Sequence, residues 1–278
     1  MSLPADFLFN QANLQDYVDC PRRFQLRHLL QLAWPAVAAE PADEYEAQVQ
    51  DGEAFHRLVH QHVLGIIAAE TPILPEAGPL ADWWRAYLAS PPADLPAMLL
   101  PEVTLSAPLA GYRLIAKYDL IAIEPDRRAI IVDWKTSARR PRPGWLSERM
   151  QTRVYRYLLV RAGTDLFPGL QPAQVEMIYW FANYPDQPER LPYDATQFEA
   201  DGRLLTELVV EIAGRNEPIF PLTDDVTRCR FCTYRSLCGR GITAGDLDEA
   251  DDQAAVPEEA APDWTAGFDF EQIGEIVF

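Results

Sequence analysis

Long hydrophobic runs are absent from this sequence. No segment approaches the roughly 20 uninterrupted apolar residues that a membrane-spanning helix needs, which argues against a membrane protein. The opening MSLPADFLFNQ has neither a basic stretch nor a long apolar one, so we expect no signal peptide and a cytoplasmic protein. The motif G-x-x-x-x-G-K-[S/T] is also missing, which excludes a P-loop motor within this chain.

Positive charge is scarce: 24 basic residues stand against 42 acidic ones, and the net charge is −18. Such acidity argues against a nucleic-acid partner, because phosphate binding normally requires a basic surface. The distribution weakens that argument. Residues 244–278 hold 11 acidic groups and no Lys or Arg, whereas residues 135–161 hold eight basic groups and one acidic group. We therefore expect a folded domain over 1–243 and an acidic, largely disordered tail over 244–278, which either recruits a partner or folds back as a DNA mimic.

Lysine is the rarest base, because only Lys117 and Lys135 occur beside 22 arginines. A coding bias towards arginine is the simple explanation. Under such a bias, a retained lysine raises a chemical question, since its compact ammonium has a pKa that burial can shift and arginine cannot replace that property. The role of Lys117 stays open at this point.

Hydrophobic periodicity predicts an α/β fold. Three segments rich in β-branched and aromatic residues follow one another with turn signals between them, which predicts a three-stranded meander. A further strand and several amphipathic helices lie around the meander, so we expect a central mixed sheet flanked by helices. The expected strands are 102–107, 112–124, 128–136 and 174–182, and the expected helices are two within 10–32, then 45–68, 80–90, 145–162 and 195–214.

A carboxylate–lysine pattern ends the third strand of the meander. Asp133 and Lys135 point to the same face, because side chains two residues apart on a strand do so. Asp119 lies in the preceding strand, where antiparallel pairing brings it near Asp133. Two convergent carboxylates suit a Mg²⁺ site and a neighbouring ammonium can assist phosphate chemistry, although a buried ion pair is the simpler interpretation of D-x-K alone.

Three further polar residues accompany this pattern. His56, in Gly52-x-x-x-His56, lies on the helix before the meander, and an imidazole beside two carboxylates can complete a Mg²⁺ or Mn²⁺ coordination sphere. A single helical histidine is more often packed or solvent-exposed, as His60 and His62 illustrate. Gln151 and Tyr155 share one face of the helix after Lys135, where they can contact substrate or support the metal ligands.

The four cysteines are Cys20 and then Cys229, Cys232 and Cys238. A Cys-x-x-Cys pair in a cytoplasmic protein indicates metal binding or redox chemistry. Four thiolates suit either zinc or an iron–sulfur cluster, and the one-plus-three spacing favours the cluster. Such a site would join the two ends of the domain. Arginines surround it in the sequence, which favours an anionic cluster and nearby DNA phosphates.

Taken in order, these motifs resemble the PD-(D/E)XK nucleases of the RecB type that carry an iron–sulfur cluster, a group that includes the nuclease domain of AddB and the CRISPR-associated Cas exonucleases. The resemblance covers about residues 8–240. The motifs that carry it are Cys20-Pro-Arg-Arg-Phe, Gly52-x-x-x-His56, Asp119, Asp133-x-Lys135, Gln151-x-x-x-Tyr155 and the three later cysteines.

The resemblance implies a restriction-endonuclease-like core with an assigned site. His56, Asp119, Asp133 and the backbone carbonyl of Trp134 would bind Mg²⁺ or Mn²⁺, and Lys135 would be the catalytic lysine. Gln151 and Tyr155, on the helix after Lys135, would help to bind DNA. We expect the nearby arginines Arg139, Arg140 and Arg153 to contact DNA as well. The residues Cys20, Cys229, Cys232 and Cys238 would hold a [4Fe–4S] cluster, with zinc as the alternative.

The function implied by this resemblance is a metal-dependent DNA exonuclease that acts on single-stranded ends in repair, recombination or CRISPR adaptation. Any coupling to DNA unwinding would require a helicase partner, because the chain has no motor of its own. The alternative is a catalytically weak DNA-binding or scaffold subunit of a helicase–nuclease complex. A zinc-containing structural protein is a third interpretation.

Overall fold

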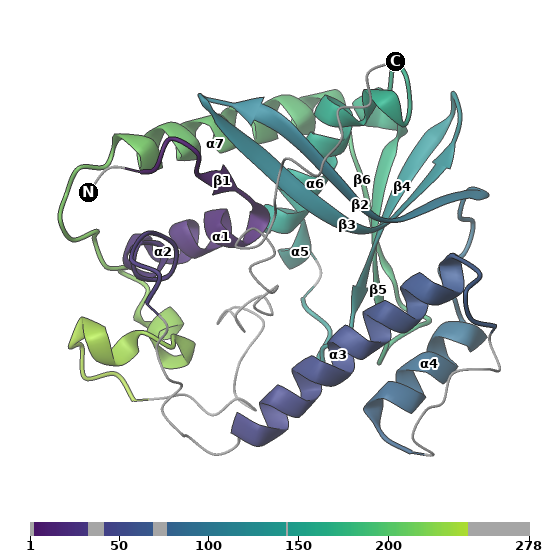
Figure 1. The fold of residues 1–278 in the computed structure, drawn as a ribbon, viewed down its shortest axis with the longest axis horizontal. Helices are drawn as coiled ribbons and strands as arrows, with labels where there is room; N and C mark the ends of the chain where they lie inside the picture. The colour runs from purple at the N-terminus through teal and green to yellow at the C-terminus, as the bar shows by residue number, and fades with distance from the viewer. Residues whose placement is uncertain (1–2, 33–41, 69–76, 143, 244–278) are drawn as a thin grey trace.

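The computed structural model describes residues 3–32, 42–68, 77–142 and 144–243, and the predicted acidic tail lies outside them. A six-stranded β-sheet forms its centre (Figure 1). The strands are β1 (Leu8–Phe9), β2 (Met98–Leu109), β3 (Tyr112–Glu124), β4 (Arg128–Lys135), β5 (Val175–Phe181) and β6 (Glu189–Pro192). β2, β3 and β4 form the predicted antiparallel meander, and β5 lies parallel to β4. The predicted mixed sheet is thus confirmed, with β1 and β6 as unpredicted additions.

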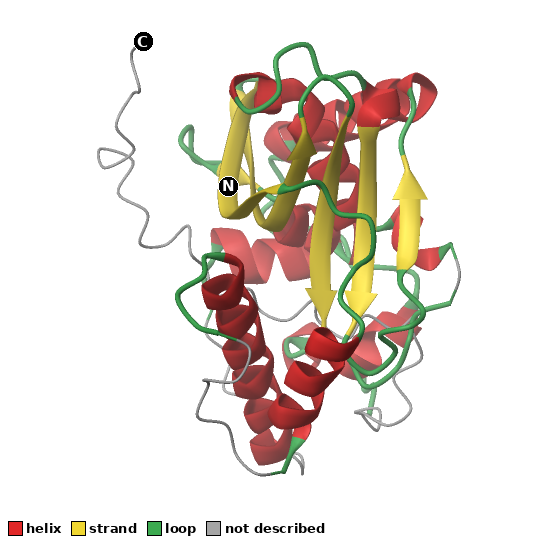
Figure 2. Ribbon diagram, turned by 90° about the vertical axis from the view of Figure 1, so that its right-hand side faces the viewer, coloured by secondary structure: helices red, strands yellow, loops and turns green. Residues whose placement is uncertain are grey.

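Helices cover both faces of the sheet (Figures 1 and 2). The helices are α1 (Gln11–Asp19), α2 (Pro21–Phe24), α3 (Ala42–Val63), α4 (Pro79–Ala89), α5 (Trp145–Glu148), α6 (Met150–Ala162) and α7 (Ala195–Gly214). A π-helical turn over Gln25–Leu29 continues α2. The described chain also contains four short 3₁₀ turns: Gly163–Asp165, Pro172–Gln174, Val226–Phe231 and Arg235–Cys238. Each of these helices is too short or too polar to cross a bilayer, so the described residues contain no candidate membrane span.

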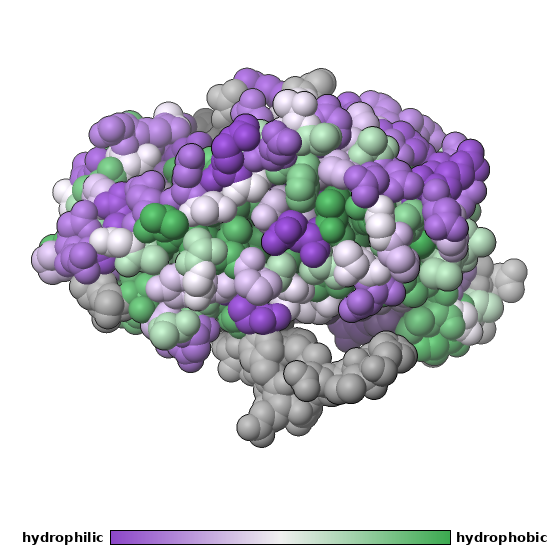
Figure 3. Space-filling view, turned by 90° about the horizontal axis from the view of Figure 1, so that it is seen from above, coloured by the Kyte–Doolittle hydropathy of each residue, from purple (hydrophilic) through white to green (hydrophobic). Residues whose placement is uncertain are grey.

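Two hydrophobic clusters divide the helices between the faces. On β4, Ile131 packs into the cluster that α1, α6 and α7 share, whereas Ile130 and Val132 pack into the cluster of α3 and α4. This period-two alternation explains why β4 is apolar from Ala129 to Val132, since both of its faces are covered there. Hydrophilic residues occupy much of the outer surface seen in Figure 3, with smaller apolar areas between them. The core therefore lies on both sides of the sheet, and the polar exceptions are Asp119 within β3 and Asp133 and Lys135 at the end of β4.

The beginnings of the helices follow capping rules in part. Asn10 caps α1 through a reciprocal capping box with Asn13, and Asp194 caps α7 in the same way. The helix predicted over 145–162 is interrupted, because Arg149 adopts an extended conformation that ends α5 and precedes α6. That interruption places the start of α6 beside the end of β4, which matters for the site.

The two ends of the domain meet beside α1 (Figure 1). Arg228 forms an ion pair with Asp19, and the Tyr234 hydroxyl donates a hydrogen bond to the carbonyl of Leu32 at 2.9 Å. These contacts place the Cys-rich turns against the N-terminal segment, as the distribution of the cysteines predicts.

Candidate active site

Antiparallel pairing of β3 with β4 positions the two predicted carboxylates. The register pairs Leu120 with Val132, so Asp119 and Asp133 occupy the next opposite positions along the two strands. Asp119 Oδ2 accepts a hydrogen bond from the backbone N–H of Trp134 at 3.0 Å. The sheet therefore brings together the carboxylates that are 14 residues apart in the sequence.

A change of phase in β3 aims Asp119 outward from the hydrophobic layers. Tyr118 and Ile121 are three residues apart and yet pack into the same cluster, so the simple alternation is interrupted between them. On the neighbouring strand, Glu102 stands between the pairs Pro101–Leu120 and Val103–Tyr118 and has a left-handed φ of 58°. Both strands thus depart from regular geometry at the position of Asp119, while the register of β2 and β3 stays the same on either side of it.

His56 reaches Asp119 from α3. Its Nδ1 lies 3.4 Å from Asp119 Oδ1, and the aromatic ring of the adjacent Phe55 anchors the helix in the core. Burial alone would raise the pKa of Asp119, but His56, the Trp134 N–H and Lys135 together lower it below its usual value. Asp119 is thus held as a carboxylate.

Lys135, Gln151 and Asp133 form a closed triangle. The Lys135 ammonium lies 2.9 Å from Asp133 Oδ2 and donates to Gln151 Oε1 at 2.9 Å, while Gln151 Nε2 donates to Asp133 Oδ1 at 2.7 Å. Burial raises the pKa of Asp133 to about 6 and the charge of Asp119 adds to this effect, although Lys135 opposes it. Neighbouring carboxylates in an apolar setting are the arrangement that a divalent cation relieves.

The donor set fits a hard divalent cation. It offers two carboxylates and one imidazole, and Asp133 Oδ2 is buried without a well-aligned hydrogen bond among the described residues. Mg²⁺ usually takes one or two protein carboxylates and keeps several waters, so a dense cage of protein ligands is not required. Within the described ranges, however, no three His, Cys, Asp or Glu side chains lie close enough together to hold a metal ion, so His56, Asp119 and Asp133 do not form a preassembled site.

Tyr179 supports the site from within the protein, whereas Tyr155 is buried and joins α6 to β3. The Tyr155 hydroxyl donates to the backbone carbonyl of Lys117 at 2.8 Å and receives a hydrogen bond from Gln11 at 3.4 Å. The Tyr179 ring lies under the Lys135 ammonium at 5.4 Å. Tyr179 was not predicted as a site residue. The sequence predicts a strand over 174–182, and the parallel pairing of β5 with β4 sets Tyr179 opposite Asp133.

The predicted DNA-contacting arginines lie in different settings. Arg139 is exposed in the loop after β4, and Arg140 stacks over the Phe181 ring at 5.7 Å. Arg153 instead forms an ion pair with the buried Asp201 at 2.7 Å. The loop after β4 therefore carries an exposed arginine, while Arg153 is paired with a buried carboxylate.

The four cysteines line one hollow. Cys20 follows the end of α1, Cys229 and Cys238 lie in the last two 3₁₀ turns, and Cys232 lies between these turns. All four are free thiols, and burial raises the pKa of Cys232 and Cys238. Cations line the same hollow, namely Arg23, Arg228 and Arg235.

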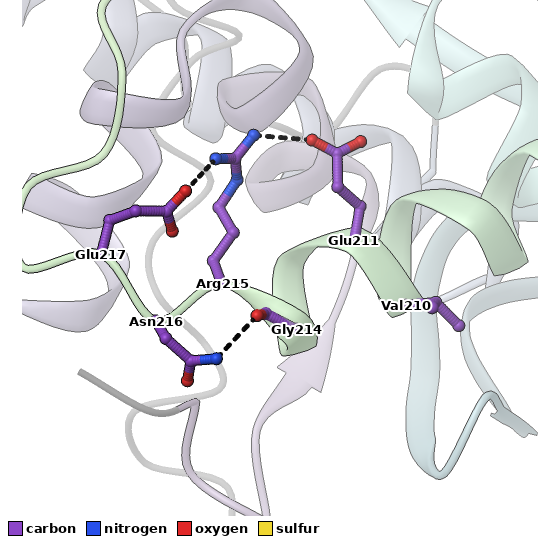
Figure 4. A pocket seen from close by; sticks show the side chains of 6 residues that line it. All are labelled: Val210, Glu211, Gly214, Arg215, Asn216 and Glu217. Atoms are coloured by element: carbon purple, nitrogen blue, oxygen red, sulfur yellow. Dashed lines mark hydrogen bonds and ion pairs between the residues drawn. The ribbon is translucent and has the colours of Figure 1, made fainter.

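A more open hollow of about 610 Å³ lies elsewhere, at the end of α7 (Figure 4). Arg215 bridges Glu211 and Glu217 there, and Asn216 turns back onto the carbonyl of Gly214. Its charged groups are already paired with one another. The carboxylate–lysine triangle, not this hollow, is the part of the described chain with the chemistry of an active site.

Comparison with known proteins identifies the family of this chain. The model of the PD-(D/E)XK nuclease superfamily matches residues 9–239, and no curated protein matches the chain. One similar solved structure is a "putative exonuclease" of Eubacterium rectale, with 9% identity, coverage of 89% of this chain and 93% of that chain, and a TM-score of 0.49. Another is the protein SSO0001, with 15% identity, coverage of 85% and 87%, and a TM-score of 0.39. The likeness to these two structures concerns the course of the backbone only.

Proposed function

Because this chain belongs to the PD-(D/E)XK nuclease superfamily, we propose that it is a Mg²⁺- or Mn²⁺-dependent DNA exonuclease of the RecB type that acts on single-stranded ends. The observation that carries the proposal is the triangle of Lys135, Gln151 and Asp133 beside the Asp119–His56 pair. A phosphodiesterase site needs cation-binding carboxylates next to a group that stabilises negative charge on phosphate, and this cluster contains both.

His56, Asp119 and Asp133, with the backbone carbonyl of Trp134, would hold the divalent cation. When bound, the cation supplies positive charge beside the scissile phosphate. Burial of the Asp133 side chain, which is only 4% exposed, keeps competing water away from one ligand. Asp119 is fixed in orientation by the Trp134 N–H, so one of its oxygens stays directed towards His56.

Lys135 would stabilise the charge that grows on the phosphate oxygens during attack. Its side chain is 27% exposed, so the ammonium is accessible to a substrate while Gln151 and Asp133 hold it. Arg139 and Arg140, in the loop that follows, would bind neighbouring phosphates of the DNA backbone. Gln151 acts by positioning, since both ends of its amide are used within the triangle.

The cysteine-lined hollow would hold a [4Fe–4S] cluster that joins the two ends of the domain over 1–243, with zinc as the alternative occupant. The three arginines around the hollow favour a cluster of net negative charge. Anaerobically purified protein should be brown and carry iron. Colourless protein with stoichiometric zinc would refute the cluster while leaving the nuclease site untouched.

The decisive experiment uses end-labelled single- and double-stranded DNA with Mg²⁺ or Mn²⁺. We expect the wild type to degrade the single strand from its end, and Lys135→Ala and Asp133→Ala to lose at least ~100-fold in rate, as for removal of a charge-stabilising group. Lys117→Ala is the matched control, because Lys117 is the other lysine of the chain and pairs with Glu102 instead. Equal degradation by all variants would exclude this site. Binding without cleavage by the wild type would favour the alternative, a scaffold subunit that works with a helicase.

A further inference from the structure

The position of Gln151 depends on where α6 begins. Gln151 is the second residue of α6, and its amide spans Asp133 and Lys135. Arg149, the N-cap residue, provides no side-chain cap for the helix. The first backbone N–H of the helix, that of Met150, instead donates to the Gln15 side chain of α1 at 3.0 Å. Gln15, on α1, thus accepts the hydrogen bond of the backbone N–H directly before Gln151, which has no partner within α6.

Gln15 is itself held in one orientation. Its Nε2 donates to Asp19 Oδ1 at 2.9 Å, and both side chains are buried. An ionised carboxylate only accepts hydrogen bonds, so the amide nitrogen must face Asp19 and the amide oxygen must face Met150. Asp19 is fixed in turn by ion pairs with Arg23 and with Arg228, the residue before Cys229. Gln15 therefore lies in a continuous chain of contacts between the Cys-rich turns and the start of α6.

We propose that Gln15 is a positioning residue of the nuclease site. By holding the N–H of Met150, it fixes the point from which Gln151 reaches Asp133 and Lys135. Helix α1, which packs along α6 (Figure 1), ends at Asp19 and Cys20, so the segment that carries the first cysteine also sets the geometry of the catalytic triangle. This inference rests on the proposed function, because it assigns Gln15 a role in that same site.

Gln11 provides a matched control on the same helix. It is also buried and also contacts α6, where its Nε2 donates to the Tyr155 hydroxyl at 3.4 Å. Tyr155 lies one turn beyond Gln151 and holds the Lys117 carbonyl, outside the triangle. Replacing either glutamine with leucine removes one buried contact between α1 and α6, but only Gln15→Leu releases the start of α6.

The test compares Gln15→Leu, Gln11→Leu and wild type in the full chain. We measure Mn²⁺ affinity by calorimetry, kcat and KM on single-stranded DNA, and unfolding temperature. Loss of a group that orients metal ligands typically costs 10- to 100-fold in metal affinity or activity. We expect Gln15→Leu to lose about that factor in kcat and in Mn²⁺ affinity with KM nearly unchanged, and Gln11→Leu to stay within about 3-fold of wild type in both. Equal losses in the two variants, or a lower unfolding temperature with unchanged Mn²⁺ affinity, would overturn the proposal.

A double variant separates positioning from loss of packing. Gln15→Glu keeps the acceptor for Met150 but places a second carboxylate beside Asp19. Adding Asp19→Asn lets the amide at position 19 donate to the carboxylate at position 15, which reverses the direction of the wild-type hydrogen bond. Because Asp19→Asn by itself removes the ion pairs with Arg23 and Arg228, this single variant is the reference. We expect Gln15→Glu to be impaired and Gln15→Glu/Asp19→Asn to recover the Mn²⁺ affinity of Asp19→Asn. Failure of the double variant to recover Mn²⁺ affinity would count against a positioning role for Gln15. Absence of DNA cleavage by wild type would instead count against the proposed function, and the comparison of Mn²⁺ affinities would still test the role of Gln15.

Discussion

Asp16 offers a quantitative test of the N-terminal ion-pair cluster. The side chain is buried at the base of α1, where Arg23 lies 2.7 Å and His28 2.8 Å from its oxygens, and Arg27 lies at 3.2 Å. Burial by itself would raise the pKa of this carboxyl. The surrounding cations outweigh burial and lower the pKa to about 2, from an ordinary value of 3.8.

The shift converts into a free energy of unfolding. A difference of about two pKa units, at about 1.4 kcal/mol for each, amounts to roughly 2–3 kcal/mol of stability contributed by the ionised form. Because the folded pKa lies below the unfolded one, this contribution is complete above about pH 5 and is lost as the pH falls towards 2. Asp16→Asn should therefore destabilise the protein by about that amount at pH 7, and by progressively less in acid.

Urea unfolding of wild type and Asp16→Asn between pH 7 and pH 3 measures this effect. Asp82→Asn is the control, because Asp82 is 64% exposed and pairs only with the equally exposed Arg85. An exposed pair contributes little, so this variant should stay within ~0.5 kcal/mol of wild type. A stability difference for Asp16→Asn that does not change with pH would refute the electrostatic origin and leave packing as the cause.

Four other outcomes follow from the same structure. Asp119→Ala should abolish cleavage through loss of the cation, with a matching loss of Mn²⁺ binding by calorimetry; retained binding would contradict its role as a ligand. Lys135→Arg should remain inactive on labelled DNA even though the charge is kept, since a guanidinium does not fit between Asp133 and Gln151. Cys229→Ala should mainly lower the unfolding temperature, and a stable, cluster-loaded variant would disprove that. Ending the chain at residue 243 should raise DNA affinity in a binding assay if the acidic tail acts as a DNA mimic; unchanged affinity leaves only the recruitment of a partner.

The arrangement of the two carboxylates could be predicted because the hairpin is local. The turn signal at Pro125 and Asp126 separates two apolar strands, and the tight turn pairs Glu124 with Arg128. Counting back from that pair sets Asp119 opposite Asp133. Period-two alternation on β4 then places Lys135 on the face of Asp133, as the structure has it.

Long-range polar pairs could not be predicted in this way. Arg153 belongs to a strongly basic stretch of sequence, yet its partner Asp201 lies 48 residues later on another helix. Arg156 lies near the same carboxylate and is 3% exposed, and Arg149 stacks on the Trp145 ring at 4.6 Å. Local charge counts assume that charges face solvent, and here tertiary packing turns several of them inward.

The two lysines of this arginine-rich chain lie in different settings. Lys135 fits between a carboxylate and an amide oxygen at 2.9 Å from each and above the Tyr179 ring, a space that suits a compact ammonium with three donors. Lys117 pairs with Glu102 and its side chain is 43% exposed, a setting in which arginine would serve as well. A composition that strongly favours arginine therefore retains lysine at position 135, where geometry requires it. Lys117 instead forms an ordinary ion pair between β3 and β2.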